Sequence, residues 1–433
     1  MSETQTVAAT PQANGLAAGP REQLAVEGGT PVRTQPWPGW PVVDEEDVQA
    51  VSDAVRSGVW GGGEQALAFA QRFADLHGVR HGIACNSGTT ALQIALSSLG
   101  VGPGDEVIVP AYTFVATATS VLLIGATPVF ADIEPNTYNL DPASVERAIT
   151  SRTRAIVPVH FGGAIADMEG FRALGEKYSI PILEDAAHAH GAVCNGQSPG
   201  AWGVAACFSF QSSKNLTCGE GGLILTNDDA VARQCRSRVN IGRVEGGAWY
   251  EHHLPGGNYR LGTMQAALLL SQLRRFPEQA HRRDQNGRYL DARLGTIEGI
   301  QPLRSDARQT LHSRHLYIFR YDSDAFGLPR QRFLELLQAE GVPASTGYPV
   351  GLHQQPLYSG RGLRGQLPGH PMPHLLAHNY SADACPVTEH ICASEAVWLT
   401  QNALLAEAHD MDDIVRAVSK IRATCNRDKQ EQA

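Results

Sequence analysis

Between about residues 82 and 227, short apolar segments alternate with amphipathic ones, and this alternation constrains the fold more than any other feature of the chain. Short apolar strands separated by helices are typical of a mostly parallel sheet that is covered on both faces. In such a sheet, ligands bind at the carboxyl ends of the strands. We therefore expect an α/β fold with seven strands, at 82–85, 106–110, 128–133, 155–160, 181–185, 205–210 and 222–227.

The rest of the chain predicts a second, smaller unit and two tails. The first residues are rich in Ala, Gln, Thr, Pro and Gly and show no periodicity, which is typical of a disordered tail. The last helix is expected at 411–422. The predicted division is a disordered tail at 1–22, a large α/β domain with an N-terminal arm at 23–295, a small α+β domain at 296–425 and a tail at 426–433.

Composition excludes several classes of function. The formal net charge is -9 and no basic run offsets it, so we expect no nucleic-acid partner. No apolar stretch approaches the roughly 20 residues that a membrane-spanning helix needs. The eight cysteines are scattered without a CxxC pair, which disfavours metal and disulfides and indicates a reducing compartment. The first residues lack a basic leader and an apolar signal core, so we expect a cytoplasmic protein.

Lys214 stands in a polar turn between a buried-looking segment at 208–210 and the glycines of 219–222. An amine that is held in such a turn can form a Schiff base with a carbonyl. The alternative is a surface lysine, but the neighbouring glycines indicate tight backbone packing around the amine.

Two further features lie upstream of this lysine. Asp185 ends an apolar strand, where a carboxylate needs a partner, either a pyridinium N–H or the start of the next helix. Residues 87–90 follow a strand and open a helix, so their free N–H groups and the helix dipole favour an anion. There Gly88 allows close approach and Thr89 adds a hydroxyl, although an ordinary helix cap is the alternative. Ser209 could supply another hydroxyl.

Aromatic and imidazole side chains complete the expected site. His188 or His190 could hydrogen-bond a ring oxygen of a cofactor, and the chain direction after Asp185 favours His188. Phe114 could stack on a pyridine ring, with Tyr112 as the competing candidate and core packing as the alternative. A phosphate site, a carboxylate and a lysine, in this chain order, are what pyridoxal 5'-phosphate needs, and we expect no metal.

Several segments together resemble the DegT/DnrJ/EryC1/StrS aminotransferases, which are sugar and cyclitol aminotransferases of pyridoxal-phosphate fold type I. The resemblance implies that Lys214 holds the cofactor covalently and moves protons. It also implies a homodimer with shared active sites, in which Asn258 of one subunit reaches the phosphate in the other. The matching segments are 86–92, 102–114, 184–188, 208–222 and 257–261. The remaining implied contacts are Asp185 with the pyridine nitrogen, His188 with the ring hydroxyl, Phe114 with the ring face, and Gly88, Thr89 and Ser209 with the phosphate.

Within the family, the segments at 36–41, 242–243, 249–250 and 397–399 are similar to the cyclitol branch. That branch includes glutamine-dependent scyllo-inosose aminotransferases and borders 3-amino-5-hydroxybenzoate synthase. The resemblance therefore implies amino transfer from glutamine or glutamate to a keto-cyclitol or keto-sugar in natural-product biosynthesis.

Substrate contacts are predicted less directly. Tyr348, His353 and the loop at 249–250 are candidates for binding a polyol. The family pattern is broken at Gly162, at 352–354 and at 400–401, and we expect these positions to face the substrate.

Three alternatives stay open at this stage. A sugar dehydratase of the same fold has histidine at the lysine position, and Lys214 argues against it. A synthase that also dehydrates its substrate, like 3-amino-5-hydroxybenzoate synthase, has a lysine at this position, so Lys214 does not exclude this alternative. A non-catalytic cofactor-binding regulator is disfavoured by the intact set of Lys214, Asp185 and phosphate-site residues.

Overall fold

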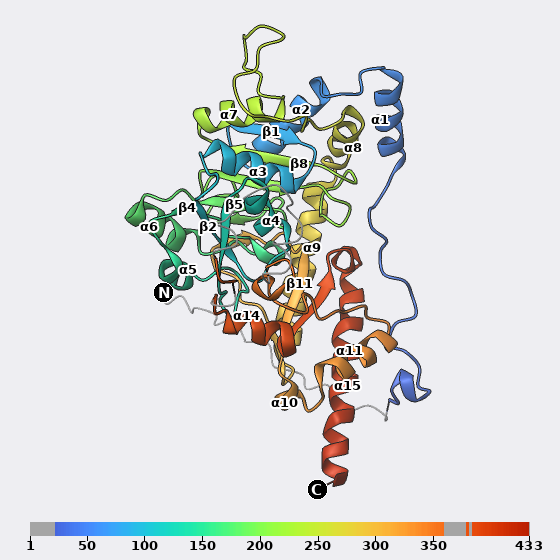
Figure 1. The fold of residues 1–433 in the computed structure, drawn as a ribbon. Coiled ribbons are helices and arrows are strands. Elements are labelled where there is room, and N and C mark those ends of the chain that lie inside the picture. The colour runs from blue at the N-terminus through green and yellow to red at the C-terminus, as the bar shows by residue number, and fades with distance from the viewer. Residues whose placement is uncertain (1–21, 359–377, 381–382, 433) are drawn as a thin grey trace, which may run out of the picture.

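The computed structural model describes residues 22–358, 378–380 and 383–432. The predicted tail at 1–22 lies outside these residues, apart from its last position. Figure 1 shows a large region that contains the sheet and a smaller one around α11 and α15, described below.

The large region is built on one mixed sheet. Its strands lie in two groups, β3-β2-β4 and β5-β7-β8-β1, which parallel bridges from Ile156 to Ile182 and from Val159 to Asp185 join. β8 is antiparallel to both neighbours and the other neighbours are parallel, so the mostly parallel seven-stranded sheet is confirmed. The bounds are β1 His81–Cys85, β2 Glu106–Pro110, β3 Thr127–Ala131, β4 Thr153–Ile156, β5 Leu183–Asp185, β7 Ala205–Ser209 and β8 Gly222–Thr226.

Hydrophobic cores cover both faces of this sheet. Neighbouring strand residues point to opposite faces, so Ile108 belongs to one core while Val107 and Val109 belong to the other. Both faces of each central strand are buried, which explains why the strands are continuously apolar rather than alternating. The helices that pack around the sheet include α2 Glu64–Leu76, α3 Gly88–Ser98, α4 Ala116–Leu123, α5 Pro142–Ala148, α6 Met168–Tyr178, α7 Asp229–Val239 and α8 Thr263–Gln272.

The smaller region has its own core around an antiparallel sheet in the order β12-β11-β9. Helix α9, Phe276–Leu294, joins the two regions, because Phe276 packs in a core of the large sheet and Leu290 in the core of the small one. A boundary near residue 295 therefore stays a prediction. The other elements are β9 Ile300–Pro302, β11 Leu316–Tyr321, β12 Ala396–Thr400, α11 Arg330–Ala339 and α15 Met411–Gln432.

Two segments differ from the sequence-based expectation. Helix α15 continues to Gln432 rather than ending at Arg422, because 423–432 contains neither glycine nor proline. The N-terminal arm, grouped above with the large domain, begins on the small core. There the carboxylate of Glu340 accepts the N–H groups of Ala25 and Val32. The arm then runs from beside α15 up to helix α1, Glu45–Arg56 (Figure 1), which the side chain of Asp44 caps.

The structure also bears on membranes and metals. Within the described ranges, no helix is long and apolar enough to cross a membrane. The same residues hold no group of three or more histidine, cysteine or acidic side chains that is arranged to bind a metal ion.

Candidate active site

A cavity of about 610 Å³ lies where the carboxyl ends of β5 and β7 meet the first turn of α3. Strands of both regions contribute to its wall, since Leu316 comes from β11 and Trp398 from β12. Eight of the predicted site residues line it: Gly88, Thr89, Phe114, Asp185, His188, Ser209, Lys214 and Tyr348.

Asp185 is buried at the end of β5. One carboxylate oxygen accepts a hydrogen bond from the Thr117 hydroxyl at 2.8 Å, and the other accepts the Ala187 N–H at 3.2 Å. Burial raises the pKa of Asp185, while these two donors and the charge of Lys214 act in the opposite direction. A buried carboxylate of this kind gains from a cation or an N–H donor within the cavity.

The start of α3 forms the anion-binding end of the cavity. Ser87 caps this helix, and its hydroxyl accepts the Thr90 N–H at 3.1 Å. The N–H groups of Gly88 and Thr89 lie in the first turn, where the helix supplies no acceptor, and they are available to an anion. A Cβ atom at Gly88 would lie 2.7 Å from Cβ of Ser209, so only glycine lets these two walls approach each other.

The structure separates the two aromatic candidates. Phe114 is 58% exposed although it is a large apolar side chain, and it lines the cavity. Tyr112 is buried among Phe161, Tyr348 and Trp398, with ring centroids 5.1–6.1 Å apart. Of the two, only Phe114 can therefore offer a ring face to a ligand.

The structure also separates the histidines. His188 lines the cavity, and its Nδ1 accepts the Gly162 N–H at 3.3 Å, so the neutral ring carries its proton on Nε2. Burial, and then the charge of Lys214, hold the pKa of His188 well below its usual range. His190 lies behind the site, where its Nε2 pairs with the backbone oxygen of Ser209 at 2.9 Å.

Lys214 lies in the turn after β7, where its N–H donates to the Gln211 carbonyl at 2.9 Å. Burial lowers the pKa of its amine to about 8, and Asp185 opposes this shift. In the described part of the chain, no side chain or carbonyl forms a hydrogen bond or ion pair with the Lys214 amine. Because a larger fraction of this amine is uncharged near neutral pH, it is a better nucleophile and base than an ordinary lysine.

The residue after the lysine anchors the turn to a distant segment. The Asn215 amide nitrogen donates to the Ser313 carbonyl at 2.6 Å, and its oxygen accepts from Nδ1 of His315 at 3.1 Å. His315 lines the cavity, and its ring centroid lies 4.2 Å from that of His188. Asn215 therefore fixes the lysine turn and the tautomer of a second cavity histidine together.

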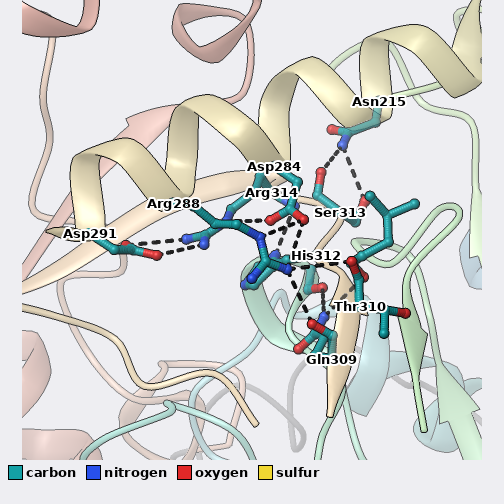
Figure 2. A network of polar contacts seen from close by, with 11 residues as sticks. Asn215, Asp284, Arg288, Asp291, Gln309, Thr310, His312, Ser313 and Arg314 are labelled. Atoms are coloured by element: carbon teal, nitrogen blue, oxygen red, sulfur yellow. Dashed lines mark hydrogen bonds and ion pairs between the residues drawn. The ribbon is translucent and has the colours of Figure 1, made fainter. Parts of the chain in front are cut away.

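Figure 2 shows how helix α9 holds this segment. Arg314 is buried and reaches Asp291 at 2.6 Å and Asp284 at 3.6 Å. A Cβ atom at Gly287 would lie 2.6 Å from the Arg314 guanidinium, so glycine is needed where the side chain crosses the helix. Two charged contacts thus fix the backbone beside His315.

The cavity does not include every predicted residue. His353 is directed at Glu389, 3.0 Å away, because the 352–354 turn packs away from the site. Gly162 supports His188 from behind, and Gln401 accepts a bond from Arg283, so the expectation that these breaks in the family pattern face the substrate is not supported. The side chain of Asn258 is exposed outside the cavity.

Among the cavity residues that sequence reasoning missed are Thr117, His315 and Trp398. Thr117 lies in the first turn of α4, three residues after the predicted ring-stacking Phe114, and that spacing was the available signal. His315 and Trp398 come from the smaller region, and nothing local in the sequence relates them to Lys214.

The sheet order, with Asp185 and Lys214 at strand ends and an anion site at a helix start, defines fold type I of the pyridoxal-phosphate-dependent enzymes. The chain belongs to the DegT/DnrJ/EryC1/StrS aminotransferase family, whose model matches residues 41–419. It is thus a pyridoxal-phosphate-dependent aminotransferase.

Two relatives and one solved structure show where in the family it lies. A Streptoalloteichus tenebrarius protein, provisionally named L-glutamine:3-amino-2,3-dideoxy-scyllo-inosose aminotransferase, is 39% identical over 92% of this chain and 98% of its own. The L-glutamine:2-deoxy-scyllo-inosose aminotransferase of Micromonospora echinospora is 38% identical over 92% and 98%. The crystal structure of 3-amino-5-hydroxybenzoic acid synthase superposes with a TM-score of 0.80 at 33% identity, over 90% of this chain and all of that one.

Proposed function

We propose that this enzyme uses pyridoxal phosphate, bound in the cavity described above, to move an amino group from glutamine to a keto-cyclitol. The observation that carries the proposal is the placement of Lys214, Asp185 and the first turn of α3 around one cavity. When bound, the cofactor supplies an electron sink that stabilises negative charge at the substrate carbon next to nitrogen.

The residues present fit this cofactor. The N–H groups of Gly88 and Thr89 would bind the phosphate, with the hydroxyl of Ser209 beside them. Asp185 would accept the pyridine N–H and keep that nitrogen protonated. Phe114 would cover one ring face, and Nε2 of His188 would donate to the ring oxygen. All six of these residues line the cavity.

Lys214 has two tasks in this proposal. Its amine holds the cofactor in the resting enzyme, and after release it takes the proton from the Cα atom of the amino donor. Burial favours both tasks, because it keeps a fraction of the amine uncharged at neutral pH. In the first half of the reaction the Lys214 ammonium would pass the Cα proton on to the cofactor, and in the second half the amine would take a proton back and deliver it to the carbon that carried the ketone.

The wall of the cavity supports a neutral acceptor. In the described residues that line it, the only side chains with full charges are Asp185, Lys214 and Glu220. Tyr348 and Trp398 form the side that belongs to the smaller region, with their rings 4.9 Å apart and nearly perpendicular. An aromatic wall with few charges suits a polyhydroxylated ring better than a phosphorylated or carboxylated acceptor. The relatives named for scyllo-inosose derivatives agree with this assignment.

The shared active site is part of the same proposal. Asn258 is exposed, and a backbone bridge to Asn240 holds it in the loop that follows α7. We assign its amide to the phosphate in the partner subunit, in a homodimer whose two sites each take residues from both chains.

The test is to incubate the purified enzyme with pyridoxal phosphate, glutamine and scyllo-inosose, and then to identify an amino-cyclitol by mass spectrometry. Lys214→Ala is the control, and it should lose both the product and the visible absorbance of the bound cofactor. No amino-cyclitol from this mixture, together with an aromatic amine when a cyclic keto acid replaces scyllo-inosose, would instead favour the reaction named for the 3-amino-5-hydroxybenzoic acid synthase. Unchanged absorbance and turnover in Lys214→Ala would refute the central role of this lysine.

A further inference from the structure

The N-terminal arm contains two tryptophans, Trp37 and Trp40, in the motif Trp-Pro-Gly-Trp. Each indole N–H donates to a backbone carbonyl far away in the sequence. Trp37 donates to Gly341 at 2.8 Å, in the smaller region, and Trp40 donates to Ser212 at 2.9 Å, in the turn that carries Lys214. The motif therefore connects the smaller region to the catalytic turn at two defined points.

Each indole also lies under a guanidinium. Arg33 lies 4.0 Å from the ring centroid of Trp37, and Arg283 lies 5.1 Å from that of Trp40. The Arg33 guanidinium has carboxylate partners as well, since it reaches Asp410 at 2.7 Å and Asp413 at 2.9 Å. The two indoles are thus held in similar ways, but the environments of their arginines differ.

Arg283 is 0% exposed, and its Nε donates to the Gln401 side chain at 2.8 Å. Neither of its two terminal nitrogens has a hydrogen-bond acceptor in the described structure. A desolvated guanidinium is attracted to the face of an indole, so the ring of Trp40 is the principal electrostatic compensation of Arg283. The buried cation therefore fixes the plane of the indole, and with it the direction of the N–H.

We infer that Trp40 is a positioning residue for Lys214. Its N–H fixes the carbonyl of Ser212 on the side of the turn before the lysine, while Asn215 holds the side after it. With both flanks held, the amine keeps one position relative to Asp185 and the cavity. Trp40 is not among the residues that line the cavity, so in this inference it acts through the turn. The inference rests on the proposed role of Lys214.

The test compares Trp40→Phe with Trp37→Phe in the full-length chain. Both variants keep an aromatic ring under an arginine and lose one indole N–H bond to a carbonyl, but only one of these bonds reaches the lysine turn. The first measurement is amide hydrogen exchange of the 211–216 segment in the cofactor-free protein. A hydrogen bond contributes about 0.5–1.5 kcal/mol, so Trp40→Phe should speed exchange there by roughly two- to tenfold and Trp37→Phe should leave it unchanged.

The second measurement is the single-turnover rate of the half-reaction with glutamine. Trp40→Phe should lower the rate constant by a similar factor, with the glutamine concentration for half-maximal rate unchanged, whereas Trp37→Phe should match the wild type. Equal exchange at 211–216 in the two variants, or equal half-reaction rates, would overturn the inference. A wild-type enzyme that does not react with glutamine would contradict the proposed function instead, and the exchange comparison would still decide the role of Trp40.

Discussion

Thr117→Val tests the electrostatic design of the site at one atom. The substitution keeps the size and branching of the side chain and removes the hydroxyl that donates to Asp185 at 2.8 Å. The Ala187 N–H then remains as a weaker donor at 3.2 Å. A hydrogen bond to a charged group contributes about 1.5–3 kcal/mol, so its loss should raise the pKa of Asp185 further above its usual value.

Two consequences follow for the variant. First, an Asp185 that ionises less readily pairs less well with a protonated ring nitrogen, so pyridoxal-phosphate affinity and kcat should each fall by roughly 10- to 100-fold. Second, burial already raises the pKa of Asp185 in the folded protein, so the unfolded chain releases this proton first as pH rises. The contribution of Asp185 to the stability of the cofactor-free protein is therefore lost as pH rises above about 3.9, the pKa of an aspartate in the unfolded chain. Thr117→Val should extend this loss to higher pH.

The assay combines a fluorescence titration with pyridoxal phosphate and denaturant unfolding of the cofactor-free protein between pH 4 and 8. Ser120→Ala is the matched control, because Ser120 is buried on the same helix and its hydroxyl donates to the Thr117 carbonyl at 2.9 Å rather than to a carboxylate. If Thr117→Val binds the cofactor within twofold of the wild type and its unfolding curves follow those of Ser120→Ala, the reasoning about Asp185 is wrong.

Three further predictions concern the phosphate site, the lysine and the subunit interface. Gly88→Ala should cost about 1–3 kcal/mol of stability and weaken cofactor binding, because its Cβ would lie 2.7 Å from that of Ser209; Gly102→Ala, with no heavy atom within 4 Å, should do neither in the same melts and titrations. The folded cofactor-free protein binds fewer protons at Lys214 than the unfolded chain between about pH 8 and 10.5, so its stability relative to Lys214→Met should rise through that window, and parallel pH profiles would contradict this. Mixed subunits of Lys214→Ala and Asn258→Ala should recover about a quarter of the wild-type activity after random exchange, and no recovery would place Asn258 outside the partner's site.

The sequence predicted those parts of the site whose signal is local. Asp185 ends one buried strand, Lys214 lies in the turn after another, and Gly88 opens a helix, so their positions at the edge of the sheet followed from the strand pattern. Thr117 could not be assigned to Asp185 in the same way, because β4 lies between the strand before Thr117 and the strand that ends in Asp185, and the two residues meet only when the whole sheet assembles.

The missed role of His315 and the misplaced role of His353 have a similar physical origin. The role of His315 depends on a contact with Asn215 that spans 100 positions. Tyr348 and His353 looked alike as substrate contacts, yet the turn at 352–354 directs His353 toward Glu389 and leaves Tyr348 in the cavity wall. Such outcomes depend on the path of one turn, which residue types alone do not determine.

Helix α9 has a consequence for how such an enzyme can change. Its first turn packs in a core of the large sheet and its last turns pack in the core of the small sheet. The two regions are therefore joined by one continuous helix rather than by a hinge. Mutations on β11 and β12 can therefore change the side of the cavity assigned to the acceptor without disturbing the side assigned to the cofactor. A new acceptor specificity could then arise by substitutions in the smaller region, while the cofactor site in the large region stays unchanged.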